Sequence, residues 1–199
     1  LAEFWSSHGY VCIHPNHADA LEGDQAADIR EVARKVRGDR VSWINRAADV
    51  KFIIDSLDDL PEKSPALKGK IDRKRVAAAG HGMGAHTAEV VGGARLNVPA
   101  GGNLGDPRVD AVVAVSMFSE AVTATEPERL LAITGEWEGF LREAAVDALR
   151  LVDETAEEGD TAQADGVVRR AVVAPRVEHV GVLYSPVALA EARAWLDAA

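Results

Sequence analysis

Residues 76–86 limit the fold most strongly. A run of small apolar residues comes first, three glycines at alternate positions follow, and an amphipathic stretch begins directly after them. Residues 75–79 have the short apolar run of a buried strand, and residues 85–95 have the spacing of a helix. Gly80, Gly82 and Gly84 permit a sharp corner between the two, since glycine adopts backbone angles that other residues avoid. A strand that turns at once into a helix is the repeating unit of an α/β fold.

Apolar runs and amphipathic segments alternate along the rest of the chain, which predicts a mostly parallel, doubly wound sheet with helices on both faces. The predicted strands are residues 10–14, 75–79, 109–116, 130–134 and 169–174. The predicted helices are residues 41–60, 85–95 and 140–152, followed by a last helix that Ser185 caps and Pro186 begins. Residues 20–40, with a short exposed helix over 29–36, residues 97–107 and residues 153–165 are predicted loops.

Composition narrows the class of protein. We expect 199 residues, 47% of them hydrophobic, to form a single domain of a soluble protein, either cytoplasmic or a part of an exported protein. The net charge of −10 disfavours nucleic acid and anionic membranes as partners, because phosphate groups bind clustered lysine and arginine. No stretch has the roughly 20 apolar residues that span a bilayer. Cys12 is the only cysteine, so an intramolecular disulfide is excluded.

Three candidate catalytic positions follow three of the predicted strands. Gly82 follows strand 75–79, Glu138 follows strand 130–134 and His179 follows strand 169–174, with Glu136 as the alternative acid. Because the carboxyl ends of parallel strands meet at one edge of a sheet, we expect these positions to lie together. Their order is that of a nucleophile, an acid and a histidine, but position 82 has no side chain.

Five stretches of the chain, one of them made of two segments before the glycine turn, resemble the α/β-hydrolase family in this order, with details that favour its dienelactone-hydrolase-like and lipase-like esterase branches. Residues 80–85 match the G-H-S-M-G-A form of its nucleophile elbow at every position but the serine, which Gly82 replaces. The other similar segments are residues 1–17 before the elbow, 46–50 and 71–76 on the approach to it, 133–135 at the acid-bearing strand end, and 178–180 in the histidine loop.

The resemblance implies a carboxylic-ester hydrolase acting on a small-molecule ester or acyl compound. The residue at position 82 would attack the ester carbonyl, His179 would take its proton, and Glu138 would hold the imidazole tautomer. The backbone N–H of Met83 would stabilise the oxyanion. Since Gly82 has no hydroxyl, the resemblance implies an inactive or impaired enzyme.

Other interpretations of the glycine turn remain open. The same fold could serve as a non-catalytic pseudoenzyme that binds a ligand or partner, or the glycines could only permit close packing of helix and strand. Dinucleotide binding is disfavoured, because G-x-G-x-G is not G-x-G-x-x-G. The family has further strands before the segment that matches residues 1–10. We therefore expect N-terminal strands to be missing, so that the chain is either a fragment of a longer protein or a reduced version with a smaller sheet and half an oxyanion hole. We also expect a missing segment or a partner to cover the open sheet edge.

Four histidines raise the question of a metal site. His14 and His17 form H-x-x-H, while His81 and His86 flank the glycine turn. No third ligand of defined spacing accompanies them, so we predict neither a metal nor a cofactor. We expect His81 to line the pocket together with Trp137, whose alternative role is in the core, and His86 to pack on its helix.

Overall fold

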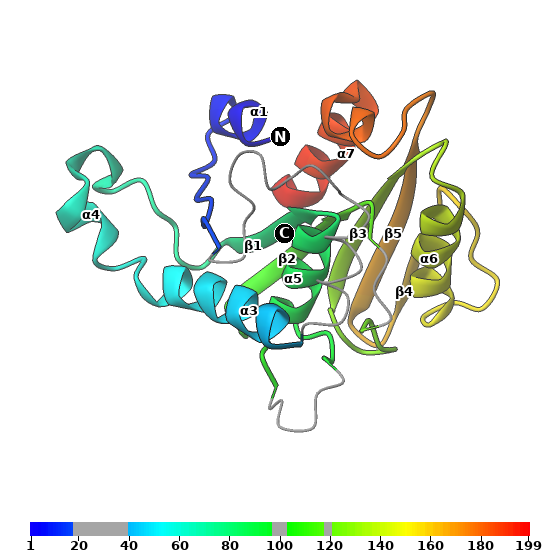
Figure 1. The fold of residues 1–199 in the computed structure, drawn as a ribbon, viewed down its shortest axis with the longest axis horizontal. Helices are drawn as coiled ribbons and strands as arrows, with labels where there is room; N and C mark the ends of the chain where they lie inside the picture. Colours follow the sequence, from blue (N-terminus) through cyan, green and yellow to red (C-terminus); the bar gives the residue numbers. More distant parts are fainter. Residues whose placement is uncertain (18–39, 97–102, 118–120) are drawn as a thin grey trace.

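The computed structural model describes residues 1–17, 40–96, 103–117 and 121–199, and its centre is a five-stranded sheet (Figure 1). The sheet has the order β1-β2-β3-β5-β4. All neighbouring strands are parallel except β4, which pairs antiparallel with β5. The predicted mostly parallel α/β sheet is therefore confirmed. The strands are β1 (Val76–His81), β2 (Val109–Val115), β3 (Arg129–Gly135), β4 (Thr161–Ala164) and β5 (Val167–Ala174).

Helices cover both faces of the sheet. Helices α5 (Met83–Val91) and α6 (Gly139–Arg150) pack on one face, while α1 (Ala2–Ser7) and α7 (Pro186–Asp197) pack on the other. Strand β2 contributes Val112 and Ala114 to the first layer and Val113 and Val115 to the second. This two-sided burial explains why the central strands are continuous apolar runs. Helix α3 (Arg40–Asp55) lies outside α5 and packs on it (Figure 1).

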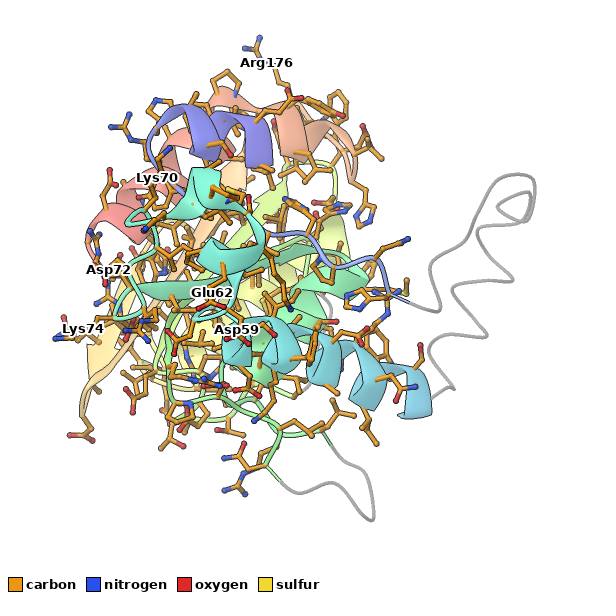
Figure 2. All side chains as sticks on the ribbon, turned by 90° about the vertical axis from the view of Figure 1, so that its left-hand side faces the viewer. Asp59, Glu62, Lys70, Asp72, Lys74 and Arg176 are labelled. Atoms are coloured by element: carbon orange, nitrogen blue, oxygen red, sulfur yellow. The ribbon has the colours of Figure 1, made fainter. Side chains whose placement is uncertain are left out.

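The helix predicted over residues 41–60 is shorter than expected. Helix α3 ends at Asp55, and a turn leads to the short helix α4 (Leu60–Lys63), which has Pro61 in its first turn. A 3-10 turn, η2 (Pro65–Leu67), follows. Charged side chains of this connection, from Asp59 to Lys74, lie along one side of the molecule (Figure 2). None of the helices in the described segments is long and apolar enough to cross a membrane.

Strand β4 corrects the prediction that residues 153–165 form a loop throughout. Asp165 and Gly166 join β4 to β5 with φ angles of 48° and 88°, the left-handed values of a two-residue hairpin turn. Asp-Gly is a strong sequence signal for this turn. The signal was available, but β4 has a single buried residue, Ala162, and thus no apolar run.

The strand predicted over residues 10–14 is absent, so that prediction is wrong. In the described part of the chain these residues pair with no strand, and β1 pairs only with β2. Tyr10 and Cys12 pack against the layer formed by α1 and α7, whereas Val11 and Ile13 are largely exposed. Alternating burial therefore arises here from packing of an extended chain without a ladder of hydrogen bonds. A segment or partner that covers the open edge of β1 stays a prediction.

Two further predictions concern helix ends and loops. Ser185 occupies the N-cap position of α7 and Pro186 begins the helix, but the Ser185 hydroxyl makes no capping hydrogen bond, so its predicted capping role is wrong. The helix predicted over residues 29–36 lies outside the described residues, as do residues 97–102 of the predicted loop 97–107. Between β5 and α7 the chain forms residues 175–180, called the histidine loop below, and the 3-10 turn η3 (Gly181–Tyr184).

Candidate functional site

The corner between β1 and α5 has the geometry that the glycine spacing predicts. Strand β1 ends at His81, helix α5 begins at Met83, and Gly82 between them has φ 55° and ψ −113°. Few residues other than glycine adopt this conformation without strain. The Gly82 N–H donates to the Val115 carbonyl of β2 over 2.9 Å, so the neighbouring strand fixes the corner.

His179 lies directly above this corner. A β-carbon built on Gly82 would lie 3.5 Å from Nε2 of His179, and apart from its two chain neighbours it would meet no other of the described residues within 4 Å. The second imidazole nitrogen, Nδ1, is 2.6 Å from Oε1 of Glu138. The Glu138 side chain is 4% exposed and the His179 side chain 49%, so a buried carboxylate orients a ring that solvent reaches. The structure thus brings Gly82, Glu138 and His179 together.

The two candidate acids have different partners. Glu138 is at the N-cap position of α6 and its carboxylate faces the His179 ring. The Glu136 carboxylate instead accepts the backbone N–H of Arg176 over 2.6 Å, which ties the end of β3 to the histidine loop. Of the two acids, Glu138 is therefore the one placed to orient the imidazole.

Sequence reasoning missed Ser116, which holds the second oxygen of Glu138. The Ser116 hydroxyl donates to Oε2 over 2.8 Å, and the Gly135 N–H donates to the same oxygen over 2.6 Å. Ser116 directly follows β2 and is fully buried. Its position at a strand end was the available signal, but the predicted strand 109–116 included this residue and so gave it no chemical role.

His81 supports the histidine loop. Its Nε2–H donates to the His179 carbonyl oxygen over 2.7 Å, and the two rings lie with centroids 4.4 Å apart. Burial lowers the pKa of His81, which favours the neutral ring, although the hydrogen bond to the His179 carbonyl opposes this effect. Met83 opens α5, so its backbone N–H has no acceptor within the helix and faces the region of the corner. Trp137, predicted as a pocket wall or a core residue, is 66% exposed beside Glu138 and is not in the core.

The remaining histidines do not gather around a metal. His17 pairs with Asp49 over 2.7 Å, while His86 packs edge-on against Trp43, and burial lowers the pKa of His86 to about 4. His14 is exposed. Within the described ranges, no group of three or more histidine, cysteine, aspartate or glutamate residues could hold a metal ion.

Strained backbone also occurs where the chain leaves two of the parallel strands. Three non-glycine residues in the described segments have positive φ, and one of them, Asp165, belongs to the hairpin turn. The other two are Ser116 at 54° and Arg176 at 58°. Both follow the carboxyl ends of strands, and Figure 2 shows the Arg176 side chain at the upper edge of the molecule, pointing away from it. Strain of this kind collects at functional sites.

The arrangement has a definite chemical capacity. A carboxylate that holds Nδ1 of an imidazole leaves Nε2 free to accept a proton from a group beside it. Here the place beside Nε2 is above Gly82, at the start of a helix whose N-terminal N–H groups favour negative charge. No protein-family model, curated protein or solved structure matches the chain.

Proposed function

We propose that the chain carries the catalytic centre of a carboxylic-ester hydrolase of the α/β-hydrolase type, inactive or impaired because Gly82 occupies the nucleophile position. One observation carries the proposal. Nε2 of His179 lies 3.5 Å from the point where a side chain at position 82 would begin, while Glu138 holds Nδ1. An imidazole so placed is positioned to take a proton from a serine hydroxyl at position 82.

The proposed reaction needs a hydroxyl at position 82. Oγ of a serine there would bond to the ester carbonyl carbon while its proton passes to Nε2 of His179, and Glu138 would stabilise the resulting imidazolium. The Met83 N–H would bind the oxyanion. The imidazolium would then protonate the leaving alcohol, and water activated by His179 would release the acid from the acyl-enzyme. Without Oγ, only direct activation of water by His179 remains.

Restoring the hydroxyl tests the proposal. We expect Gly82→Ser to raise kcat/KM for p-nitrophenyl acetate and butyrate by about 1,000-fold or more over the unsubstituted chain, since loss of one triad member costs several powers of ten. Gly82→Ala adds the same β-carbon without a hydroxyl and should show no gain. Gly82→Ser combined with His179→Ala should lose the gain. A Gly82→Ser protein with native circular dichroism and no increase in hydrolysis would refute the proposal.

A second candidate function is a non-catalytic pseudoenzyme that binds an acyl or aromatic ligand. Gly82 itself favours it, because the glycine leaves the position 3.5 Å from Nε2 of His179 without a side chain. Isothermal titration of the unsubstituted chain with butyrate and p-nitrophenol should then show binding that His179→Ala weakens. Hydrolysis on introduction of Gly82→Ser would count against this candidate, whereas binding without any gain in hydrolysis would favour it.

A further inference from the structure

We infer that Ser116 is a positioning residue whose hydroxyl fixes the Glu138 carboxylate, so that Glu138 holds the His179 imidazole toward position 82. Its importance for catalysis rests on the proposed function. The positioning itself does not, because it concerns the orientation of one imidazole in the chain as it stands.

The hydrogen bonds of Glu138 divide between its two oxygens. Oε1 faces Nδ1 of His179, while Oε2 accepts the Ser116 hydroxyl and the Gly135 N–H. Rotation of the carboxylate away from His179 would break both bonds to Oε2. In a buried site such a loss is unfavourable, since no water replaces the missing donors. Ser116 therefore acts on the imidazole through Glu138.

Backbone conformation points to the same role for the hydroxyl. Ser116 has φ 54°, in the left-handed region where glycine is favoured over serine. Its N–H donates to the Ile133 carbonyl over 2.7 Å, which holds the residue in this conformation. Glycine would satisfy the backbone at lower energy, so the feature that serine adds here is its side chain. The hydroxyl of that side chain donates to Glu138.

The position of Ser116 also links the acid to the corner. The preceding residue, Val115, accepts the Gly82 N–H over 2.9 Å, while Ser116 donates to Glu138. Strand β2 lies between β1, which leads to Gly82, and β3, which leads to Glu138. Two successive residues at the end of β2 thus fix position 82 on one side and the acid on the other.

Thr134 provides a matched control. It is fully buried near the end of β3, and among the described residues its hydroxyl has no hydrogen-bond partner. Thr134→Val removes a buried hydroxyl of the same sheet edge with little change of shape. Any effect common to Thr134→Val and the Ser116 variants is therefore a general effect of altering this edge.

The test follows the His179 tautomer by ¹⁵N NMR of the imidazole in the chain with Gly82 unchanged. We expect the unsubstituted chain and Thr134→Val to hold the Nδ1–H tautomer. Ser116→Gly and Ser116→Ala should reduce its population by at least about twofold. In the Gly82→Ser background, the loss of Ser116 should lower kcat by about 10- to 100-fold with little change in KM.

Unchanged His179 tautomers in folded Ser116→Gly and Ser116→Ala would overturn the inference, as would an equal change in Thr134→Val. If neither Ser116 variant folds, Ser116→Cys replaces the hydroxyl with a weak donor of similar size, and an unchanged tautomer there would overturn it too. The two proposals fail separately. Absence of hydrolysis in Gly82→Ser refutes the esterase proposal alone, whereas an unchanged tautomer refutes the role of Ser116 alone.

Discussion

Alanine substitutions at the three glycines of the corner should have three different effects, because each glycine satisfies a different requirement. At Gly80 the requirement is space. A β-carbon there would overlap the backbone of Gly84 and lie 2.6 Å from the Ala85 nitrogen, so the end of β1 and the start of α5 would have to separate. Backbone atoms cannot rotate out of the way as a side chain does. We expect Gly80→Ala to lower the free energy of unfolding by about 3 kcal/mol or more.

At Gly82 the requirement is conformation. Among the described residues beyond its chain neighbours, a β-carbon there meets the His179 ring alone, at 3.5 and 3.8 Å, which is ordinary contact. The cost comes from φ 55°, and we expect Gly82→Ala to lower the free energy of unfolding by about 1–2 kcal/mol. Gly84 has neither requirement, since it belongs to α5 and no described residue outside its own stretch of helix lies within 4 Å of its β-carbon position. Gly84→Ala should therefore raise the free energy of unfolding by about 0.5–1 kcal/mol.

Urea unfolding followed by circular dichroism and tryptophan fluorescence measures the three values. Equal slopes with denaturant concentration would show that the variants differ in stability alone. The expected order of stability is Gly84→Ala, the unsubstituted chain, Gly82→Ala and then Gly80→Ala. A Gly80→Ala protein within about 1 kcal/mol of the unsubstituted chain would refute the steric argument. A Gly84→Ala protein as unstable as Gly82→Ala would refute the conformational one.

Three further predictions concern other contacts. Burial lowers the pKa of His86 from 6.5 to about 4, so as the pH falls the unfolded chain binds a proton before the folded chain does. Between about pH 7.5 and pH 5, urea titrations should show a decrease of about 2 kcal/mol in the free energy of unfolding, and His86→Phe should lack this decrease. Arg108→Ala should lower the free energy of unfolding, measured in urea, by about 1–3 kcal/mol, because the carboxylate of Asp106, which is 2% exposed, loses its guanidinium partner. As a control, Arg73→Ala removes an ion pair with Asp58 in which both side chains are exposed, and it should change this free energy by under about 1 kcal/mol. Gly135→Ala places a β-carbon 2.5 Å from the Val177 carbonyl oxygen, so the histidine loop must move. The Nδ1–H tautomer of His179 should then fall at least about twofold in population by ¹⁵N NMR, and an unchanged spectrum would contradict this prediction.

The central strands β2 and β3 could be predicted from the sequence because burial on both faces gives each of them a long apolar run. Leu130 to Ile133 in β3 is almost inaccessible to solvent, and the prediction of 130–134 agrees closely with the observed strand. Where burial is one-sided or pairing is absent, the same signal fails. It missed β4, and it predicted a strand at residues 10–14, whose side chains alternate in burial without pairing.

Part of the candidate site could also be predicted from the sequence, and part of it could not. Because the ends of parallel strands converge, the order of the strands along the sequence was enough to predict that Gly82, Glu138 and His179 lie together. The choice of Glu138 over Glu136 was open, because it depends on which direction each side chain takes after the strand ends. Ser116 was missed for another reason. The predicted strand 109–116 extended over it, and an apolar run does not encode the left-handed conformation that turns its hydroxyl toward Glu138.

The orientation of the His179 imidazole does not depend on a side chain at position 82. Ser116 and Gly135 hold Glu138, while His179 is held by Glu138 at its ring and by His81 at its carbonyl oxygen. None of these contacts uses a side chain at position 82. In the proposed hydrolase, glycine there removes the reacting atom and leaves His179 and its supports assembled, so a single substitution can distinguish an impaired hydrolase from a binding protein. The contacts of His179 with Glu138 and His81 therefore orient the imidazole in a chain that has no serine hydroxyl at this position.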